Sequence, residues 1–278
     1  TLVNNNWQSV TFGNGLYVAV SSTGANNRVI TAPADSSWVM GAVVPRPWTT
    51  QASAADKNWQ SVTFGNNLFV AVANDATSNG VMTSSDGITW TTQAALSTLY
   101  WTGVTFGDGL FVAVSQTGTG NRVMTSPDGI NWTTQASAAD LAWQSITFGN
   151  NKYVAVGSSE TMTSSDGITW TTTATITQFW NDVTFGGGLF VAVSTTSTNN
   201  RVITSPDGIV WTTRSPAADL GWQAITFGNN LFVAVANNNI MTSSDGITWT
   251  TQLIPVSSAW YSVTYGDGLF VLVISSSK

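Results

Sequence analysis

The 278-residue sequence contains no cysteine and no histidine, and these two absences exclude several kinds of chemistry. Without cysteine the chain has no disulfide framework and no thiolate nucleophile. Without histidine it can form no Ser-His-Asp triad, no Cys-His pair and hardly any of the usual zinc sites. We therefore expect no metal centre and no cofactor, and we expect stability to come from the burial of apolar surface.

Charged residues are also scarce. Only 8% of the residues are charged, and eight Lys and Arg residues against 14 Asp and Glu leave a net charge of −6. Binding of phosphate backbones needs clustered Lys and Arg side chains, so the composition argues against a nucleic-acid partner. Solubility must come from Ser, Thr and Asn, which favours an extracellular, cell-surface or virion-borne β protein.

Long hydrophobic runs are missing as well. No apolar segment approaches the roughly 20 residues that a membrane helix requires, so we predict no membrane insertion. The chain begins at Thr1 without Met or a signal segment, and we interpret it as a processed product or a fragment. Its length suits one domain over residues 1–278.

What the sequence does contain is a repeat. Seven tryptophans each open a W-x-x-[VI]-T-[FY]-G segment, at spacings of 52, 42, 42, 37, 42 and 38 residues: Trp7, Trp59, Trp101, Trp143, Trp180, Trp222 and Trp260. Each segment continues through a Gly/Asn/Asp turn, an apolar strand, a polar loop, a short strand and S-x-D-G-x-x-W-T-T. A period near 40 with four strand-sized runs is typical of a propeller blade and not of a helical solenoid.

The predicted fold is an all-β propeller with seven repeats of four-stranded antiparallel blades. Its units are residues 7–58, 59–100, 101–142, 143–179, 180–221, 222–259 and 260–278. The last unit is incomplete, because it holds only the strands Trp260–Tyr265 and Leu269–Ile274. Six blades would leave this segment without a place, whereas eight would preserve an alternation between neighbouring units. The uncovered strand Leu269–Ile274 predicts self-association or the addition of a partner strand.

Unit two illustrates the predicted strands, which are Trp59–Phe64, Leu68–Val72, Val81–Thr83 and Ile88–Thr92. An Asp carboxylate can accept backbone N–H bonds across its own tight turn, and Gly supplies the positive φ that other residues resist. Five copies of this turn are predicted to be structural and not catalytic: Asp86-Gly87, Asp128-Gly129, Asp166-Gly167, Asp207-Gly208 and Asp245-Gly246.

The turn resembles the Asp box (BNR-type repeat) of sialidase-like propellers, whose pattern is S-x-D-x-G-x-x-W. The matching residues in unit two are Ser84, Asp86, Gly87 and Trp90, and the likeness extends through most of the chain. Here Gly directly follows Asp, so the turn is one residue shorter than the family pattern. The resemblance implies a propeller architecture with structural turns at the blade periphery.

The resemblance does not extend to sialidase catalysis, which needs three clustered Arg residues, a Tyr nucleophile with a Glu partner, and an acidic Asp. The only glutamate is Glu160, at the start of a third strand where other units carry Val or Ile. We therefore expect no enzymatic activity. A glycosidase that uses two Asp residues is a remote alternative.

Thirteen of the fourteen tryptophans occupy two repeat positions, the opening position and one near the fourth strand: Trp48, Trp90, Trp132, Trp170, Trp211 and Trp249. Indole faces can stack on sugar rings, but such regular placement favours packing between blades. Trp38 is the exception, because it lies in a Pro-bounded insertion in the first unit, and it is a candidate contact residue for a ligand.

Alternate units share a second pattern. Units one, three and five carry Arg28, Arg122 and Arg201 before the third strand, and Asp56, Asp140 and Asp219 after the fourth. Propeller topology places both positions on the face of the second-to-third-strand loops. These residues are interpreted as three polar sites for sugar hydroxyls, as ion pairs that hold each crossover in place, or as both.

The sequence thus predicts a lectin-like or adhesin-like recognition module that binds a glycan or another cell-surface ligand through loops on one face. Repeated weak sites would gain strength through avidity. The alternative is a structural building block of an extracellular or viral assembly. Calcium binding where loop Asp and Asn residues cluster stays an open alternative, although no D-x-D-x-D-G run supports it.

Overall fold

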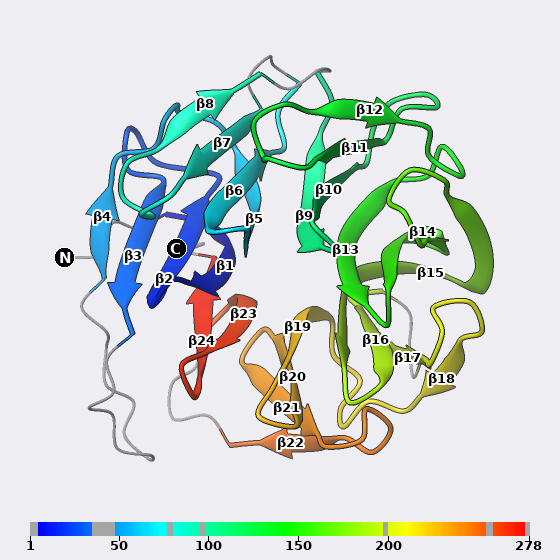
Figure 1. Ribbon diagram of the computed structural model, residues 1–278. Coiled ribbons are helices and arrows are strands. Elements are labelled where there is room, and N and C mark those ends of the chain that lie inside the picture. Colours follow the sequence, from blue (N-terminus) through cyan, green and yellow to red (C-terminus); the bar gives the residue numbers. More distant parts are fainter. Residues whose placement is uncertain are drawn as a thin grey trace.

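The computed structural model describes residues 5–34, 48–76, 80–94, 98–196, 200–253 and 258–275, with the backbone alone at 174–177. Within these ranges the regular structure consists of strands, arranged as blades around a ring (Figure 1). The predicted all-β propeller of four-stranded antiparallel blades is confirmed. Trp38 lies outside the described residues, and no helix within them could span a membrane.

Four of the described blades are separate antiparallel sheets, in which the chain runs from the innermost to the outermost strand. Blade 1 contains β1 (Trp7–Gly13), β2 (Leu16–Ser21), β3 (Val29–Pro33) and β4 (Thr49–Gln51); blade 2 contains β5 (Trp59–Gly65), β6 (Leu68–Ala73), β7 (Val81–Ser84) and β8 (Thr91–Gln93); blade 3 contains β9 (Trp101–Gly107), β10 (Leu110–Ser115), β11 (Val123–Ser126) and β12 (Thr133–Gln135); blade 6 contains β19 (Trp222–Gly228), β20 (Leu231–Ala236), β21 (Asn239–Ser243) and β22 (Thr250–Gln252).

Blades 4 and 5 form one six-stranded sheet that contains two long strands. Their elements are β13 (Trp143–Gly149), β14 (Lys152–Ser164), β15 (Thr171–Gly186), β16 (Leu189–Ser194), β17 (Val202–Ser205) and β18 (Thr212–Arg214). β14 covers the second and third positions of blade 4, and β15 runs from its outermost position into the innermost position of blade 5. The repeat spacing here is 37 residues, the shortest in the chain, which leaves little room for separate connecting loops.

Within unit two, the structure moves the start of the fourth strand. β8 begins at Thr91 and not at Ile88, as the sequence pattern predicted. The reason is that the Asp86 carboxylate accepts hydrogen bonds from the N–H groups of Ile88 and Thr89, at 2.8 and 2.7 Å, which therefore belong to the turn. The second strand is buried on both faces, because it lies between neighbouring blades.

The hydrophobic core is divided among the junctions between blades. At one junction, Val18 and Val20 of blade 1 pack with Trp59 and Phe69 of blade 2, and all four are fully buried. The opening tryptophans supply the largest buried surfaces. Each blade therefore depends on its neighbours for a core.

Blade 7 consists of β23 (Trp260–Gly266) and β24 (Leu269–Ile274) among the described residues, and it closes the ring against blade 1 (Figure 1). A Cβ atom at Gly266 would lie 2.1 Å from the Phe12 ring, as one at Gly107 would from Phe148. Asn6 and Ser275 form an antiparallel bridge that corresponds to Asn74–Tyr100 between blades 2 and 3. The blade 7–blade 1 junction therefore repeats the others, and the described residues form a ring of seven blades.

Candidate ligand-binding site

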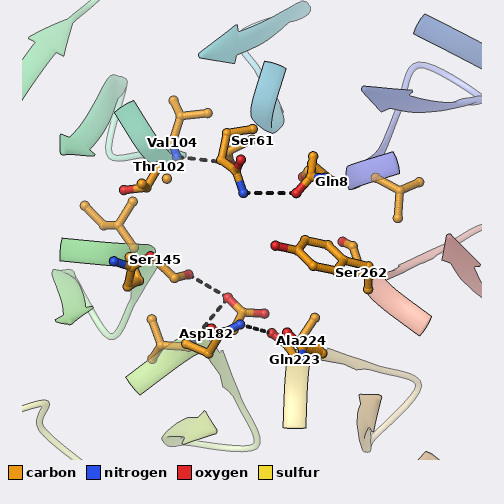
Figure 2. Close-up of a pocket in the computed structure, with 18 of the residues that line it drawn as sticks. Gln8, Ser61, Thr102, Val104, Ser145, Asp182, Gln223, Ala224 and Ser262 are labelled. Atoms are coloured by element: carbon orange, nitrogen blue, oxygen red, sulfur yellow. Dashed lines mark hydrogen bonds between the residues drawn. The ribbon is translucent and has the colours of Figure 1, made fainter. Parts of the chain in front are cut away.

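A polar pocket of about 210 Å³ lies on the propeller axis, surrounded by the seven innermost strands (Figure 2). Its lining comes from the residues that follow each opening tryptophan. The first position after the tryptophan supplies Gln8, Gln60, Thr102, Gln144, Asn181, Gln223 and Tyr261. These residues lie where the chain enters each innermost strand. The pocket is therefore nearer the face that carries the second-to-third-strand loops, which we call the loop face.

A β-bulge explains why two consecutive residues line the pocket. In β5 the register shifts between Trp59 and Ser61, so Gln60 has no partner on β6, and most other innermost strands show the same shift. In a regular strand adjacent side chains point to opposite faces, whereas a bulge re-aims one of them. Both residues after the tryptophan therefore reach the axis.

The second position after the tryptophan is small in six of the seven blades: Ser9, Ser61, Gly103, Ser145, Ala224 and Ser262. The Ser9 hydroxyl oxygen accepts a hydrogen bond from the Val62 N–H at 3.3 Å, and that of Ser61 accepts one from the Val104 N–H at 3.2 Å. A serine here thus satisfies a backbone donor of the next blade.

Blade 5 carries Asp182 at this position. Its Oδ1 accepts hydrogen bonds from the Ser145 hydroxyl at 2.6 Å and from the Val183 N–H at 2.9 Å, and its Oδ2 accepts one from the Ile225 N–H at 2.8 Å. Part of the residue remains accessible. Loss of water around the carboxyl group nevertheless raises the pKa of Asp182 to about 6, and its hydrogen bonds offset only part of this effect.

Sequence reasoning missed this pocket. The tryptophan repeat drew attention to its constant positions, whereas Asp182 lies at a variable one. The signal was present, because alignment of the units shows one carboxylate where the others have Ser, Gly or Ala. What the sequence did not show is that a bulge turns this position toward the axis.

Asp182→Ser is expected to stabilise the protein at pH 7.5. Because the folded pKa, about 6, lies above the ordinary value of 3.8, folding binds a proton in this window, and stability falls as the pH rises through it. The variant lacks this cost, and the introduced serine hydroxyl can accept the Ile225 N–H, as Ser61 accepts that of Val104. One pKa unit corresponds to about 1.4 kcal/mol, so the gain should be on the order of 1–2 kcal/mol after solvent screening.

Urea unfolding of both proteins at pH 7.5 and pH 4.5 measures this effect. The difference between them should shrink at the lower pH, where Asp182 is protonated in the folded state. A variant that is less stable than the parent protein at pH 7.5 would contradict the prediction.

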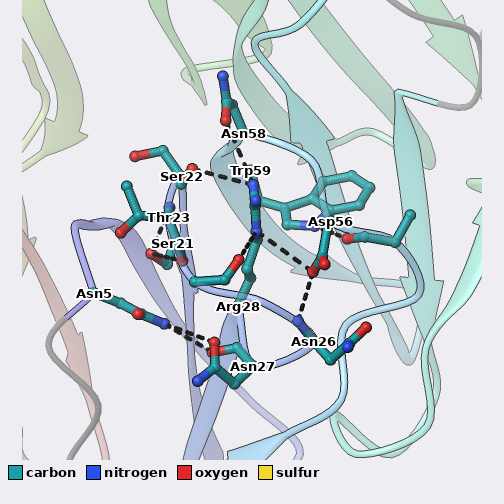
Figure 3. Close-up of polar contacts among 12 residues, drawn as sticks. Asn5, Ser21, Ser22, Thr23, Asn26, Asn27, Arg28, Asp56, Asn58 and Trp59 are labelled. Atoms are coloured by element: carbon teal, nitrogen blue, oxygen red, sulfur yellow. Dashed lines mark hydrogen bonds and ion pairs between the residues drawn. The ribbon is translucent and has the colours of Figure 1, made fainter.

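The predicted Arg and Asp residues lie on the loop face, one pair each in blades 1, 3 and 5, away from the axial pocket. Figure 3 shows the first pair, in which Arg28 Nε lies 3.6 Å from Asp56 Oδ1. Arg28 also donates to the carbonyl oxygens of Gly24 at 2.7 Å and Ser22 at 3.1 Å. Asp56 accepts the Asn26 N–H at 2.6 Å. The pair therefore fixes the loop between β2 and β3.

The other two pairs vary this arrangement. Arg122 lies 3.6 Å from Asp140 and donates to the Gly118 and Gln116 carbonyls, whereas Arg201 donates directly to Asp219 at 2.7 Å. The arginine side chains are only 12–14% exposed, and the aspartates are 39–40% exposed. The observed arginine contacts shape the loops, and the carboxylates are the more accessible groups.

Arg122→Ala is expected to lower the free energy of unfolding by about 1–3 kcal/mol, because two loop carbonyls lose a charged donor. Thermal unfolding measures this, with Lys152→Ala as a matched loss of one positive charge on the opposite face. An unchanged melting temperature would show that Arg122 does not hold its loop, and would leave its side chain available for a ligand.

The Ser-x-Asp-Gly turns lie on the face opposite the loops. In blade 2, Ser84 donates to Asp86 at 2.9 Å and accepts the Gly87 N–H at 2.8 Å, and Gly87 has a φ of 71°. The hydrogen bonds from Thr89 and Ile88 lower the pKa of Asp86 to about 2. The carboxylate is thus occupied by its own turn, as its counterparts are at Asp128, Asp166, Asp207 and Asp245.

The tryptophans of the described residues pack within the ring and do not form a sugar-stacking surface. Trp59, Trp143, Trp180 and Trp222 are fully buried. Glu160 is partly exposed on β14. In the described part of the chain, no group of three or more His, Cys, Asp or Glu side chains could hold a metal ion.

Comparison with known proteins places this geometry in a wide structural class. No protein-family model and no curated protein matches the sequence. Virginiamycin B lyase from Staphylococcus aureus is similar in structure, with a TM-score of 0.83, 13% identity and coverage of 99% of this chain and 94% of that one. A structure of YCF48 bound to D1 peptide is also similar, with a TM-score of 0.70, 15% identity and coverage of 98% of this chain and 89% of that one. YCF48 from Cyanidioschyzon merolae has a TM-score of 0.69 and 14% identity, with coverage of 99% of this chain and 94% of that one. These likenesses show a β-propeller scaffold.

Proposed function

We propose that this protein is a non-catalytic recognition module that binds a glycan on the loop face, with a sugar unit seated in the axial pocket. The observation that carries the proposal is the pocket lining. Five amide side chains converge there, together with serine hydroxyls and Tyr261. An amide both donates and accepts hydrogen bonds, as a sugar hydroxyl does, so this lining suits a polyhydroxyl ligand.

The pocket's size limits the ligand. Pockets for drug-sized molecules occupy roughly 300–1,000 Å³, whereas this pocket has about 210 Å³. A single sugar unit at the end of a glycan is therefore a better fit than an internal stretch of several units. Further units would extend over the loop face.

The loops of blades 1, 3 and 5 lie on the same face as the opening of this pocket, but farther from the propeller axis. Each is held by an Arg–Asp pair, so its polar groups are already ordered before a ligand arrives, which lowers the entropic cost of binding. In this proposal Asp56, Asp140 and Asp219 are peripheral contacts, and their arginines position the loops. Trp38 remains a candidate contact.

The scarcity of charge and the abundance of Ser, Thr and Asn support a location outside the cell or on a virion. We also infer that the Ser-x-Asp-Gly turn is a shortened Asp box, since its carboxylate only orders the turn. The similarity to a lyase and to a peptide-bound propeller stands at 13–15% identity, which is too low to carry over either protein's ligand.

A glycan-array screen tests the proposal. The double variant Gln60→Ala/Gln144→Ala removes two amides from the pocket, whereas Gln93→Ala removes an amide that contacts Thr83 on the outer part of blade 2. We expect the double variant to lose at least about tenfold in affinity, the equivalent of roughly 1.4 kcal/mol, and Gln93→Ala to bind like the parent protein. Absence of glycan binding by the parent protein would refute the proposal.

A second candidate function is assembly through β24. Among the described residues this strand pairs only with β23, whereas the second strands of blades 1, 2, 3, 5 and 6 also pair with a third. Ile274 is 39% exposed at its end. An unpaired strand edge is a template for strand addition, and we propose a second copy of this chain as its partner.

Light scattering across a range of protein concentrations tests the assembly. Ile274→Lys places a charge at the exposed end of the edge strand and should shift any oligomer toward monomer. A parent protein that remains monomeric at every concentration would refute the second candidate.

A further inference from the structure

Among the described residues that line the axial pocket, Asp182 is the only carboxylate, and none is Lys or Arg. The groups that face it come from β13, β15 and β19 and are a serine hydroxyl and two backbone N–H groups. The other titratable group of the lining is Tyr261, on β23. The negative charge of Asp182 therefore has no positive partner within this described lining.

The blade architecture does not require this charge. Ser9 and Ser61 occupy the same repeat position and satisfy the same backbone donor of the following blade. Ala224 shows that even this hydrogen bond can be omitted. Partial burial of a carboxylate without a counter-charge costs free energy. A group that is costly and dispensable for folding is a strong candidate for ligand recognition.

We propose that the axial pocket selects a ligand with a protonated amine, which places its ammonium group on the Asp182 carboxylate. The class that combines this group with the hydroxyls suited to the amide lining is an amino sugar with a free amine. The inference rests on the proposed function for the hydroxyl contacts, whereas the ammonium contact rests on Asp182 alone.

The carboxylate geometry favours an ammonium group over a divalent metal ion. Calcium takes six to eight oxygen ligands, usually including several carboxylates. The pocket offers one carboxylate, and its two oxygens already accept three hydrogen bonds. An ammonium group has three donors, which one carboxylate oxygen and neighbouring amide oxygens can accept.

The interaction should depend on pH. Asp182 binds a cation only when it is ionised, and burial raises its pKa to about 6. Binding should therefore weaken as the pH falls from 7 to 5. The amine of the ligand becomes more protonated over the same range, so a loss of affinity must come from the protein.

Isothermal titration calorimetry with glucosamine, N-acetylglucosamine and glucose at pH 7 and pH 5 tests the proposal. At pH 7 glucosamine should bind at least about tenfold more tightly than the two neutral sugars. Asp182→Ser should remove this preference, so that glucosamine no longer binds more tightly than glucose. Asp182→Ala, which copies Ala224 of blade 6, should give the same result without a hydroxyl that could accept from the amine.

Asp267→Asn is the control for net charge. Asp267 lies in the exposed turn of blade 7, and Asn66 occupies the corresponding place in blade 2 with a similar positive φ, 47° against 43°. The control should keep the preference for glucosamine.

The outcomes separate the two proposals. Equal binding of glucosamine and glucose by the parent protein would overturn the amine proposal and leave the glycan proposal standing. Binding of methylamine that requires Asp182, without binding of any sugar, would support the ammonium contact and overturn the glycan proposal. Binding of Ca²⁺ that requires Asp182 would show that Asp182 recognises a metal ion and would overturn the amine proposal. No binding of any of these probes would overturn the amine proposal.

Discussion

Trp143→Ala is expected to lower the free energy of unfolding by about 3–5 kcal/mol, the usual cost of truncating a large aromatic residue in a core. Trp143 is fully buried at the junction of blades 3 and 4, where it packs with Val112 and Val114 on one side and Ile146 and Tyr153 on the other. The substitution leaves a cavity between two blades that have no other core at this point.

Urea denaturation followed by circular dichroism measures the loss. Trp211→Ala provides a matched control, because Trp211 is only partly buried and packs at the edge of its core. It should cost clearly less. If Trp143→Ala cost less than about 1 kcal/mol, the opening tryptophans would not be the residues that hold the blades together, and a stacking role would need to be reconsidered.

Phe12→Ala is expected to cost about 2–4 kcal/mol, and Phe106→Ala about the same. The two rings have matching surroundings. Phe12 covers Gly266, and its ring centroid lies 4.7 Å from that of Tyr17. Phe106 covers Gly65, and its ring centroid lies 4.6 Å from that of Phe111. Phe12 lies at the closure between blades 7 and 1, whereas Phe106 lies between blades 2 and 3. Equal losses in urea denaturation are the signature of a closed ring.

Unequal losses would contradict closure. If Phe106→Ala were costly and Phe12→Ala nearly neutral, blade 7 would not rest against blade 1 in solution. The junction also contains the Asn6–Ser275 bridge and the hydrogen bond from the Tyr17 hydroxyl to the Gly266 carbonyl. Hydrogen exchange of the Ser275 amide, which donates to the Ala259 carbonyl at 3.1 Å within blade 7, shows separately whether that blade is itself intact.

Departures from the repeat point to function more clearly than the repeat itself. The repeated tryptophans and Asp-Gly turns are occupied by packing and by their own hydrogen bonds. Asp182 is a single departure on the axis, and its charge is not needed to join the blades. The Arg–Asp pairs share features of both groups. They recur in alternate blades, as structural residues do, but they fix loops that vary in sequence.

The sequence by itself determined the blade. Its turns need Gly, Asn or Asp at positive φ, and its strand lengths follow from the apolar runs, so local patterns were sufficient to predict a seven-unit β-propeller. Even here the first residues of the fourth strand were misassigned, because the Asp86 carboxylate competes with the sheet for their N–H groups.

Only the tertiary structure decided how the ring closes and what faces its axis. Closure by a blade that has two strands among the described residues depends on whether seven junctions add up to a full turn, which is a property of all the blades together. The axial position of Asp182 depends on a bulge and on six other innermost strands that enclose the same space. Arg28, Arg122 and Arg201 are each held between a carbonyl oxygen of their own loop and the Asp of the crossover to the next blade. These features arise from contacts between distant segments, and a local repeat does not encode them.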